Sequence, residues 1–224
     1  MNRRNPLALA AALLLSLPLA APAQAPAQPV RLADQDALCK GMMFIDRLGL
    51  GPAIEVQPAL LLDTLRSDRP SACRWRSAML LGYFGTGDTP RDLMTFALQG
   101  LKGPVEGTEQ SIALGALHGL GIYLRTHPDA PLRAEIIDFL IDATRPEFWE
   151  GGQVTWSMPG ATPEAFGQDT ARSVLIALAL SGTEAAWREL DAISSDHRLP
   201  EGVSNRAVFA LGLLAEARAS MDPR

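Results

Sequence analysis

The sequence predicts an all-α protein, an α-solenoid of stacked helical hairpins, and two observations carry this prediction. Residues 74–101 have the pattern of two short helices joined by a glycine turn, and looser copies of this unit recur along the chain. The copies start at Arg76, Gln110, Arg172 and Arg206, and the first two and the last two of these starts are 34 residues apart. Repeats of this length are typical of helical solenoids. An irregular helical bundle with accidental periodicity is the alternative.

The unit at 74–101 shows how residue types specify each part of a hairpin. Residues 75–84 are apolar almost all round, so this first helix is expected to be buried on most sides. Gly85 and Gly87 end it, and Thr89 and Pro90 are expected to begin the second helix as N-cap and first helical residue. The second helix has one apolar stripe and is half buried. Its residues that face away from the stripe are Arg91, Thr95 and Gln99.

The N-terminus is predicted to be a signal peptide, residues 1–23. Two arginines precede an apolar run at 7–17, and Ala21-Pro22-Ala23 offers a cleavage site. The apolar run is short for a membrane span, which disfavours the alternative of an uncleaved anchor. Residues 24–33 are rich in Ala, Pro and Gln and are expected to form a disordered lead-in. The mature protein is therefore expected in the periplasm or outside the cell.

The remaining hairpins follow in order within a repeat domain at 34–219. A first helix is expected at 34–48, with a partner at 58–65. After the unit at 74–101, a third pair is expected at 108–124 and 131–141, joined by a His-Pro-Asp turn. A fourth pair begins at Arg172 and turns at 182–184, and its partner helix carries an apolar stripe that includes Trp187. A final helix is expected at 205–219, followed by a C-terminal tail at 220–224.

Residues 145–166 interrupt the periodic pattern and are predicted to be an inserted loop. The segment holds three Pro, three Gly and a cluster of aromatic residues. Long loops within compact domains are usually functional or disordered, and aromatic groups are frequent anchors of interfaces. The alternative is that the rings cover the exposed core between two hairpins, as an interrupted stack requires. The candidates for partner contact are Phe148, Trp149 and Trp156.

The pattern Arg-Ser-Ala-Met-Leu-Leu-Gly-x-x-Gly at 76–85, followed by a capped helix and a short linker, resembles HEAT-type repeats. It is most similar to the short variety found in phycobilin-lyase-like proteins. The resemblance implies a right-handed solenoid of about four and a half HEAT-like hairpins, whose second helices line the concave face. It therefore implies partner contact by the outward residues of those helices, which are Arg91, Thr95, Gln99, Arg133, Glu135, Asp138 and Asp142.

No set of residues in the sequence indicates catalysis. The three His, at 118, 127 and 197, lack a second His or a Cys at ligand spacing, so no metal site and no cofactor are expected. His118 is expected in the core, and the other two in solvated turns. The chain contains no His-Glu dipeptide, which HEAT-like hydroxylases use to hold iron, and no nucleophile elbow or phosphate-binding loop. Glu147 and Glu150 are interpreted as solvated loop residues.

The only two cysteines, Cys39 and Cys73, are predicted to form a disulfide. An exported protein meets an oxidising compartment, where an even cysteine count favours pairing. The two residues lie 34 positions apart, which places them at equivalent points of successive first helices. Helix axes about 8–10 Å apart leave only facing residues close enough for the bond. Two buried free thiols are therefore the alternative.

Charge narrows the range of partners. The net charge of the whole chain is −5, and removal of residues 1–23 leaves 18 basic and 25 acidic residues. Such a balance is unfavourable for nucleic acid, and no further apolar run could span a membrane. The sequence predicts an exported, non-enzymatic binding or scaffold protein that presents a helical surface to a protein or peptide partner. The alternative is a lyase-like enzyme that uses the 145–166 loop against the solenoid face.

Overall fold

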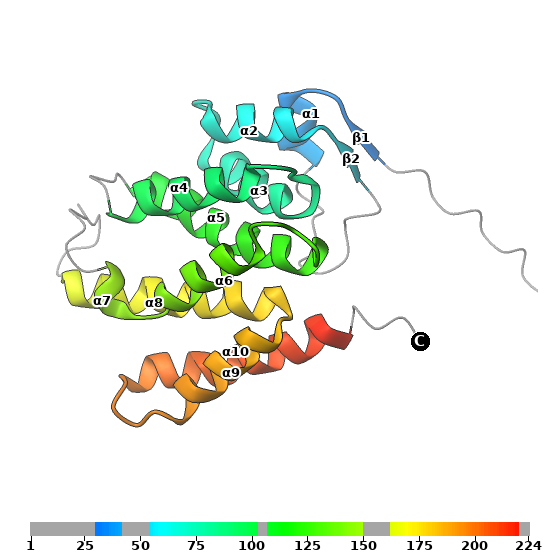
Figure 1. The fold of residues 1–224 in the computed structure, drawn as a ribbon. Coiled ribbons are helices and arrows are strands. Elements are labelled where there is room, and N and C mark those ends of the chain that lie inside the picture. Colours follow the sequence, from blue (N-terminus) through cyan, green and yellow to red (C-terminus); the bar gives the residue numbers. More distant parts are fainter. Residues whose placement is uncertain (1–29, 42–53, 103–106, 150–161, 220–224) are drawn as a thin grey trace, which may run out of the picture.

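The computed structural model describes residues 30–41, 54–102, 107–149 and 162–219 (Figure 1). This part of the chain forms ten α-helices and one pair of short strands, so the predicted all-α class is confirmed. The elements are β1 (Val30–Leu32), α1 (Gln35–Gly41), β2 (Ile54–Val56), α2 (Pro58–Arg66), α3 (Ser71–Phe84), α4 (Thr89–Lys102), α5 (Gly107–Thr126), α6 (Arg133–Asp142), α7 (Pro146–Trp149), α8 (Pro163–Ser181), α9 (Glu184–Ser195) and α10 (Glu201–Ala219).

The helices lie in two rows. In the first row α5 packs against α3 on one side and α8 on the other, and α10 packs on α8. The second row consists of α2, α4, α6 and α9, of which α2 packs on α3, α4 on α5 and α9 on α10. Figure 1 shows the second-row helices one below another from α2 to α9. The apolar side chains between the rows form one continuous core.

Small residues let the first-row helices approach closely, with α5 in the middle. A Cβ atom at Gly119 would collide with the carbonyl oxygen of Ala78 on α3, and one at Gly121 would collide with that of Ala177 on α8. Because backbone is the obstacle in both cases, no side-chain movement could make room. The small residues of α3, α5 and α8 therefore determine how near the successive hairpins lie.

Two turns have the glycine geometry that the sequence predicts, but one cap differs. Gly87 and Gly182 have φ values of 57° and 63°, the left-handed region that favours glycine. Thr183 caps α9, since its hydroxyl accepts a hydrogen bond from the Ala186 N–H at 3.1 Å. Thr89 is not the N-cap, which corrects the prediction. Its hydroxyl donates back to the Thr86 carbonyl at 2.7 Å, and α4 begins at Thr89 itself.

The expected disordered lead-in at 24–33 is wrong for its last residues. Val30–Leu32 form β1, which pairs in parallel with β2 in the register Val30–Ile54 and Leu32–Val56. Leu32 and Val56 are buried, so the strand pair is anchored by its apolar side chains. Residues 24–29, like the predicted signal peptide 1–23 and the tail 220–224, lie outside the described residues. Of the helix expected at 34–48, residues 35–41 are helical as α1, and 42–48 also lie outside.

The predicted inserted loop at 145–166 is shorter than expected, because helices enter it from both ends. One turn of helix, α7, occupies 146–149, and α8 starts at Pro163. The Thr162 hydroxyl accepts a hydrogen bond from the Ala165 N–H at 3.1 Å, and Pro163 takes the first helical position, where a missing N–H costs nothing. Thr162 and Pro163 are a standard helix start, which the high proline and glycine content of the segment conceals. Residues 150–161 lie outside the described part.

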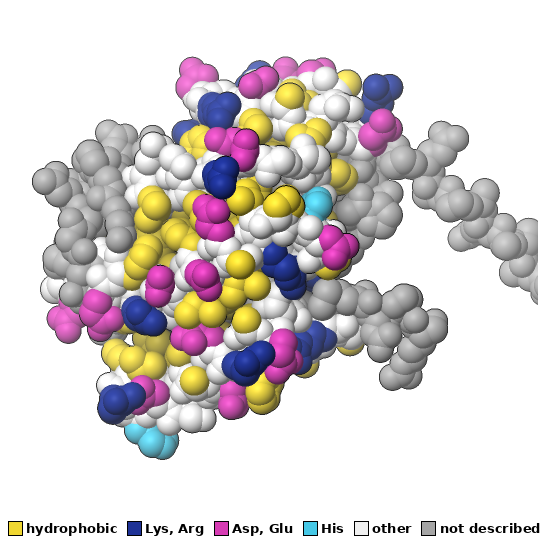
Figure 2. Space-filling model, in the orientation of Figure 1, with side chains coloured by type: hydrophobic (Ala, Val, Ile, Leu, Met, Phe, Trp, Pro, Cys, Tyr) yellow, Lys and Arg dark blue, Asp and Glu magenta, His cyan; other side chains and the backbone are white. Residues whose placement is uncertain are grey.

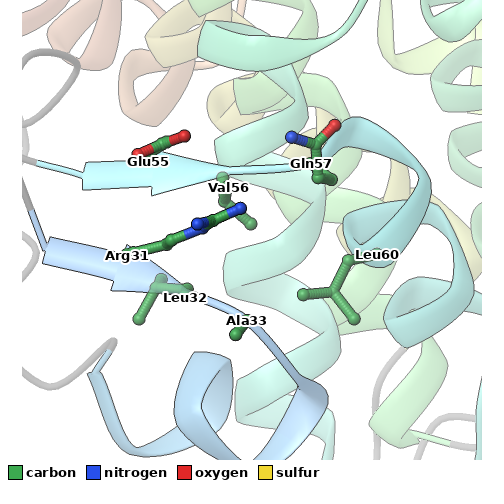
Figure 3. Close-up of a pocket in the computed structure, with 7 residues that line it drawn as sticks. All are labelled: Arg31, Leu32, Ala33, Glu55, Val56, Gln57 and Leu60. Atoms are coloured by element: carbon green, nitrogen blue, oxygen red, sulfur yellow. The ribbon is translucent and has the colours of Figure 1, made fainter.

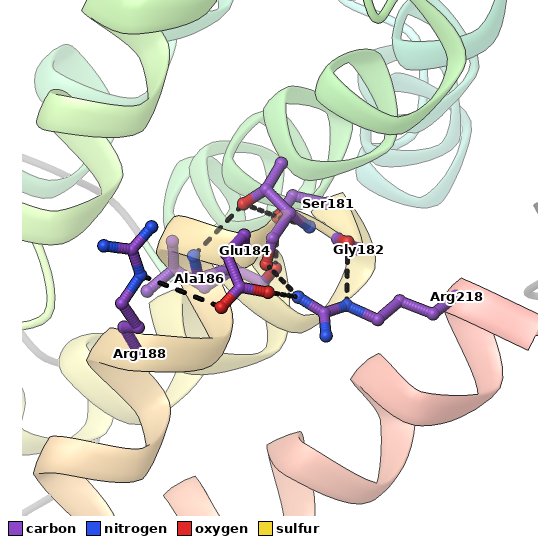
Figure 4. A network of polar contacts seen from close by, with 8 residues as sticks. Ser181, Gly182, Glu184, Ala186, Arg188 and Arg218 are labelled. Carbon is purple, nitrogen blue, oxygen red and sulfur yellow. Dashed lines mark hydrogen bonds and ion pairs between the residues drawn. The ribbon is translucent and has the colours of Figure 1, made fainter.

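The last hairpin is closed by an arginine from the end of the fold. Arg218 of α10 donates hydrogen bonds to the carbonyl oxygens of Gly182 and Thr183, at 3.2 and 3.1 Å (Figure 4). Its guanidinium also lies 2.8 Å from the carboxylate of Glu184. These carbonyls follow the C-terminus of α8, where helix geometry leaves acceptors without a partner. Arg218 therefore joins α8, α9 and α10 at one turn.

The predicted disulfide is present and ties the first helix to the row. Cys39 of α1 is bonded to Cys73 of α3, with Cα atoms 5.1 Å apart. Arg69 strengthens the same junction, because its guanidinium lies 2.6 Å from Asp36 and 3.2 Å from the side-chain oxygen of Gln35. The start of α3 thus faces α1 closely enough for the bond, although the two helices are separated in sequence by α2.

Removal of the disulfide by the double change Cys39→Ala and Cys73→Ala is expected to lower the free energy of unfolding by about 3–4 kcal/mol. The estimate is the chain entropy of an unfolded loop spanning the 34 positions between the cysteines. Urea denaturation with and without reductant measures the loss. Reductant should have no effect on the double variant, which serves as the control, and equal midpoints of the oxidised and reduced native chain would contradict the prediction.

Candidate interaction surface

The outward residues predicted on α4 are exposed, and one of them reaches the next second-row helix. Arg91, Thr95 and Gln99 all lie on the solvent side of α4. The Arg91 guanidinium is 3.2 Å from Asp88, the residue before its own helix, and 3.5 Å from Glu135 on α6. The ion pair to Glu135 brings the exposed stripes of α4 and α6 side by side. The structure therefore joins two of the predicted contact stripes into one surface.

On α6 the acidic residues face solvent and the basic one does not. Glu135, Asp138 and Asp142 are exposed, as expected for residues opposite the apolar stripe. Arg133 is half-buried and donates a hydrogen bond of 2.6 Å to the carbonyl oxygen of Leu124, near the C-terminus of α5. Its predicted outward role is wrong, because a free helix-end carbonyl holds its guanidinium. The charged side chains on the exposed side of α6 are thus all acidic.

The aromatic residues at the start of the insertion point into the protein. Trp149 is 1% exposed, and its indole N–H donates a hydrogen bond of 2.8 Å to the carbonyl oxygen of Ala143. Phe148 is half-buried between two rings, with its centroid 4.8 Å from that of Trp149 and 6.1 Å from that of Phe139. Phe166 at the other end of the insertion is 3% exposed. These placements favour the alternative that the rings cover the core. Trp156 lies outside the described residues.

A groove opens beside this aromatic cluster, between α9 and the turn from α6 to α7. Its volume is about 340 Å³. Pro146, Ile193 and Leu199 supply an apolar floor, and Glu147, Glu189 and Arg145 supply polar walls. Figure 2 shows the face of α4, α6 and α9, on which hydrophobic side chains lie between acidic and basic groups. The full lining is Thr144, Arg145, Pro146, Glu147, Glu189, Ala192, Ile193, Asp196 and Leu199.

The second-row surface is acidic, in contrast to the first row. The second-row helices α2, α4, α6 and α9 contain eight Asp and Glu and five Lys and Arg. The first-row helices α3, α5, α8 and α10 contain five Asp and Glu and six Lys and Arg. The acidic excess in the described helices is therefore concentrated on the face that carries the groove.

The charged groups around the groove are partly paired. Arg198 donates side-chain hydrogen bonds to Asp196 at 2.8 and 2.7 Å, and they lower the pKa of Asp196 to about 2. Asp196 is therefore ionised throughout the physiological pH range. Arg145 lies 3.4 Å from Asp142, and the Thr144 hydroxyl is 3.5 Å from a carboxylate oxygen of Glu189. Glu147 completes an acidic rim.

Sequence reasoning missed most of the groove, because α9 contributes residues that no motif marks. Glu189 and Ala192 lie in α9 and Asp196 follows its last residue, but their distance from α7 depends on packing between hairpins. The sequence also misplaced Trp187. It was expected in the buried stripe of α9 and is 40% exposed. The available signal was the helical spacing, in which Trp187 lies at the edge of the stripe formed by Ala186, Leu190 and Ile193.

A second pocket, of about 270 Å³, lies at the two-stranded sheet. Figure 3 shows its lining side chains, with Arg31 extending from β1 toward β2. Arg31 and Glu55 are register partners on the two strands, so the charges at its rim balance. The groove beside α7 is larger, at about 340 Å³, and three carboxylates line it against one arginine, which makes it the stronger candidate for an interaction.

The described residues contain no group of three or more His, Cys, Asp or Glu placed to hold a metal ion. His118 is half-buried in α5, and His197 is exposed. His127, expected to be solvated, stacks on the ring of Tyr123 with centroids 4.2 Å apart. Burial lowers the pKa of His127, and its contact with the Tyr123 carbonyl opposes that shift. The three rings thus lie in three separate environments.

None of the helices in the described ranges combines the length and the apolar character that a bilayer crossing requires. No protein-family model, curated protein or solved structure matches this chain.

Proposed function

We propose that the chain is an exported binding module whose second-row face holds an extended peptide segment carrying basic and apolar side chains. The observation that carries the proposal is the groove between α7 and α9, with its apolar floor and acidic rim. A groove of about 340 Å³ is at the small end of ligand sites and accommodates one or two side chains. The rest of a peptide would lie along the exposed stripes of α6 and α4.

Charge determines which peptides fit. Glu147, Glu189 and Asp196 surround the floor, and Asp138 and Asp142 continue the acidic surface along α6. Opposite charges steer association and suppress partners of the same sign. A peptide with Lys or Arg beside an apolar anchor meets both the rim and the floor. The carboxylates of the rim and of α6 would repel an acidic peptide.

Three features of the architecture belong to the same proposal. The chain is a right-handed HEAT-like solenoid, a fold whose extended faces suit peptide and protein partners. Residues 1–23 direct it out of the cytoplasm, to the periplasm or the exterior. The Cys39–Cys73 disulfide supports this destination, because such bonds persist in oxidising compartments. The partner is a protein or peptide, and the chain contributes no catalytic group to it.

The proposal is tested by selecting peptides from a random display library on the immobilised chain. Selected peptides are expected to be rich in Lys and Arg next to an apolar residue, and to bind less tightly as salt is raised. The change Ala192→Arg places a long cationic side chain at the groove, since Ala192 is exposed on α9 and lines it. It should weaken binding by at least about tenfold, or about 1.4 kcal/mol.

The matched control is Ala72→Arg, the same substitution at an exposed alanine of α3, in the first row and outside the groove lining. Its affinity for the selected peptides should stay within about twofold of the native value, because distant surface changes have small effects. Selected peptides that are acidic, or that bind the Ala192→Arg and native chains equally well, would refute the groove as the binding site.

A further inference from the structure

The large exposed apolar side chains of the described residues all belong to the last hairpin. Trp187 of α9 is 40% exposed, and Val208 and Phe209 of α10 are 58% and 52% exposed. The hairpin is the end of the first row, where α10 packs on α8 on one side. Interior helices of a row have such side chains covered by the next helix. The outer side of α10 is therefore an apolar face at the end of the stack.

A glycine on this face marks where another helix would approach. Gly212 follows Arg206 by six residues, as Gly82 follows Arg76 in α3. In α3 the neighbouring helix α5 occupies the space beside this glycine, because a Cβ at Gly82 would lie 2.7 Å from the Cβ of Ile122. A Cβ at Gly212 would meet no atom within 4 Å. The last helix thus keeps the close-approach position that α3 uses to receive its neighbour.

We propose that α10 is a homodimer interface, in which the outer faces of two copies pack antiparallel about a two-fold axis near residue 211. This pairing places Val208, Phe209 and Gly212 of one copy against the same residues of the other. A two-fold contact is self-complementary and closes on itself, so it ends the stack and adds no open edge. The acidic second-row face with the groove is left free, and the dimer does not depend on the function proposed above.

Charge complementarity identifies the second copy as the occupant. Arg206 and Glu216 flank the apolar face at its two ends, five residues on either side of position 211. The Arg206 guanidinium lies 5.6 Å from the ring centroid of Phe209, which holds it at this face. An antiparallel partner brings each Arg206 to the Glu216 of the other copy, giving two ion pairs. A parallel partner would oppose like charges instead, so the sequence of α10 favours the two-fold arrangement.

Sedimentation equilibrium on the purified chain tests the proposal. The native chain is expected to dimerise with a dissociation constant in the micromolar range, as small interfaces give. Phe209→Glu should raise that constant at least about tenfold by placing a carboxylate from each copy in the apolar contact, two like charges near the axis. The single changes Arg206→Glu and Glu216→Arg should each weaken the dimer, and combining them should restore it. Circular dichroism should show native helix content for all four, since these side chains are exposed.

The control is Asp129→Arg, a charge reversal at an exposed turn residue away from α10. It should leave the dissociation constant unchanged. A native chain that stays monomeric up to about 300 µM, far above a micromolar constant, would overturn the proposal. So would a dimer that survives Phe209→Glu, or a combined charge exchange that fails to restore association. A monomer that instead holds a different protein through Phe209 would assign the face to that partner and equally overturn the proposal.

Discussion

Replacing Trp149 with alanine is expected to lower the free energy of unfolding by about 3–5 kcal/mol, the usual cost of truncating a buried large aromatic residue. The side chain is 1% exposed and its N–H is bonded to the carbonyl oxygen of Ala143. The helix turn that carries it packs on α8. The change therefore creates a cavity between α6 and α8 and leaves a buried carbonyl without its donor. Urea denaturation followed by circular dichroism gives the loss directly.

Trp187→Ala is the matched control, because it removes the same side chain from a position that is 40% exposed. Trp187→Ala should lower the free energy of unfolding by less than half as much as Trp149→Ala, since folding removes less of the Trp187 side chain from water. Equal losses at the two positions would mean that Trp149 is no more important to the core than a surface residue. A Trp149→Ala chain of native stability that loses peptide binding would instead support the interface role assigned to Trp149 from the sequence.

Replacing Leu81 with aspartate is expected to unfold the domain. Leu81 is 0% exposed and lies in α3, in the continuous core between the two rows. A buried carboxylate without a partner is among the most destabilising single changes, on the order of 5 kcal/mol or more. Domains of this kind have total stabilities of about 5–15 kcal/mol, so little or no margin remains. The far-ultraviolet circular dichroism of the variant at 25 °C, against that of the native chain, measures the outcome.

Arg91→Ala serves as the comparison on the neighbouring helix. Its side chain is 56% exposed and its ion pairs to Asp88 and Glu135 lie in water, where such pairs contribute about 0–1 kcal/mol. Its melting temperature should therefore stay close to that of the native chain. A larger loss at Arg91 than at Leu81 would show that the buried and exposed faces of the hairpin at 71–102 have been exchanged.

Helices and turns could be predicted from the sequence because their determinants are local. Glycine supplies the positive φ at positions 87 and 182 whatever surrounds it, and the apolar stripe of α4 follows from spacing along a few turns. The disulfide was also within reach, since Cys39 and Cys73 lie 34 residues apart, the spacing of the repeat. What remained open there was a distance, 5.1 Å between Cα atoms, which depends on how α1 packs against α3.

The features that the sequence alone left undecided all depend on groups far apart in the chain. Val30–Leu32 become a strand only because 54–56 lie alongside, and Trp149 is buried only because α8 returns beneath it. The groove beside α7 needs α9, which follows about 40 residues later. The sequence by itself therefore determined the longer helices, their glycine turns and most of their apolar faces, through chemistry within a few residues. Tertiary structure decided which aromatic rings are covered and which charges meet, because burial and proximity are properties of packed elements.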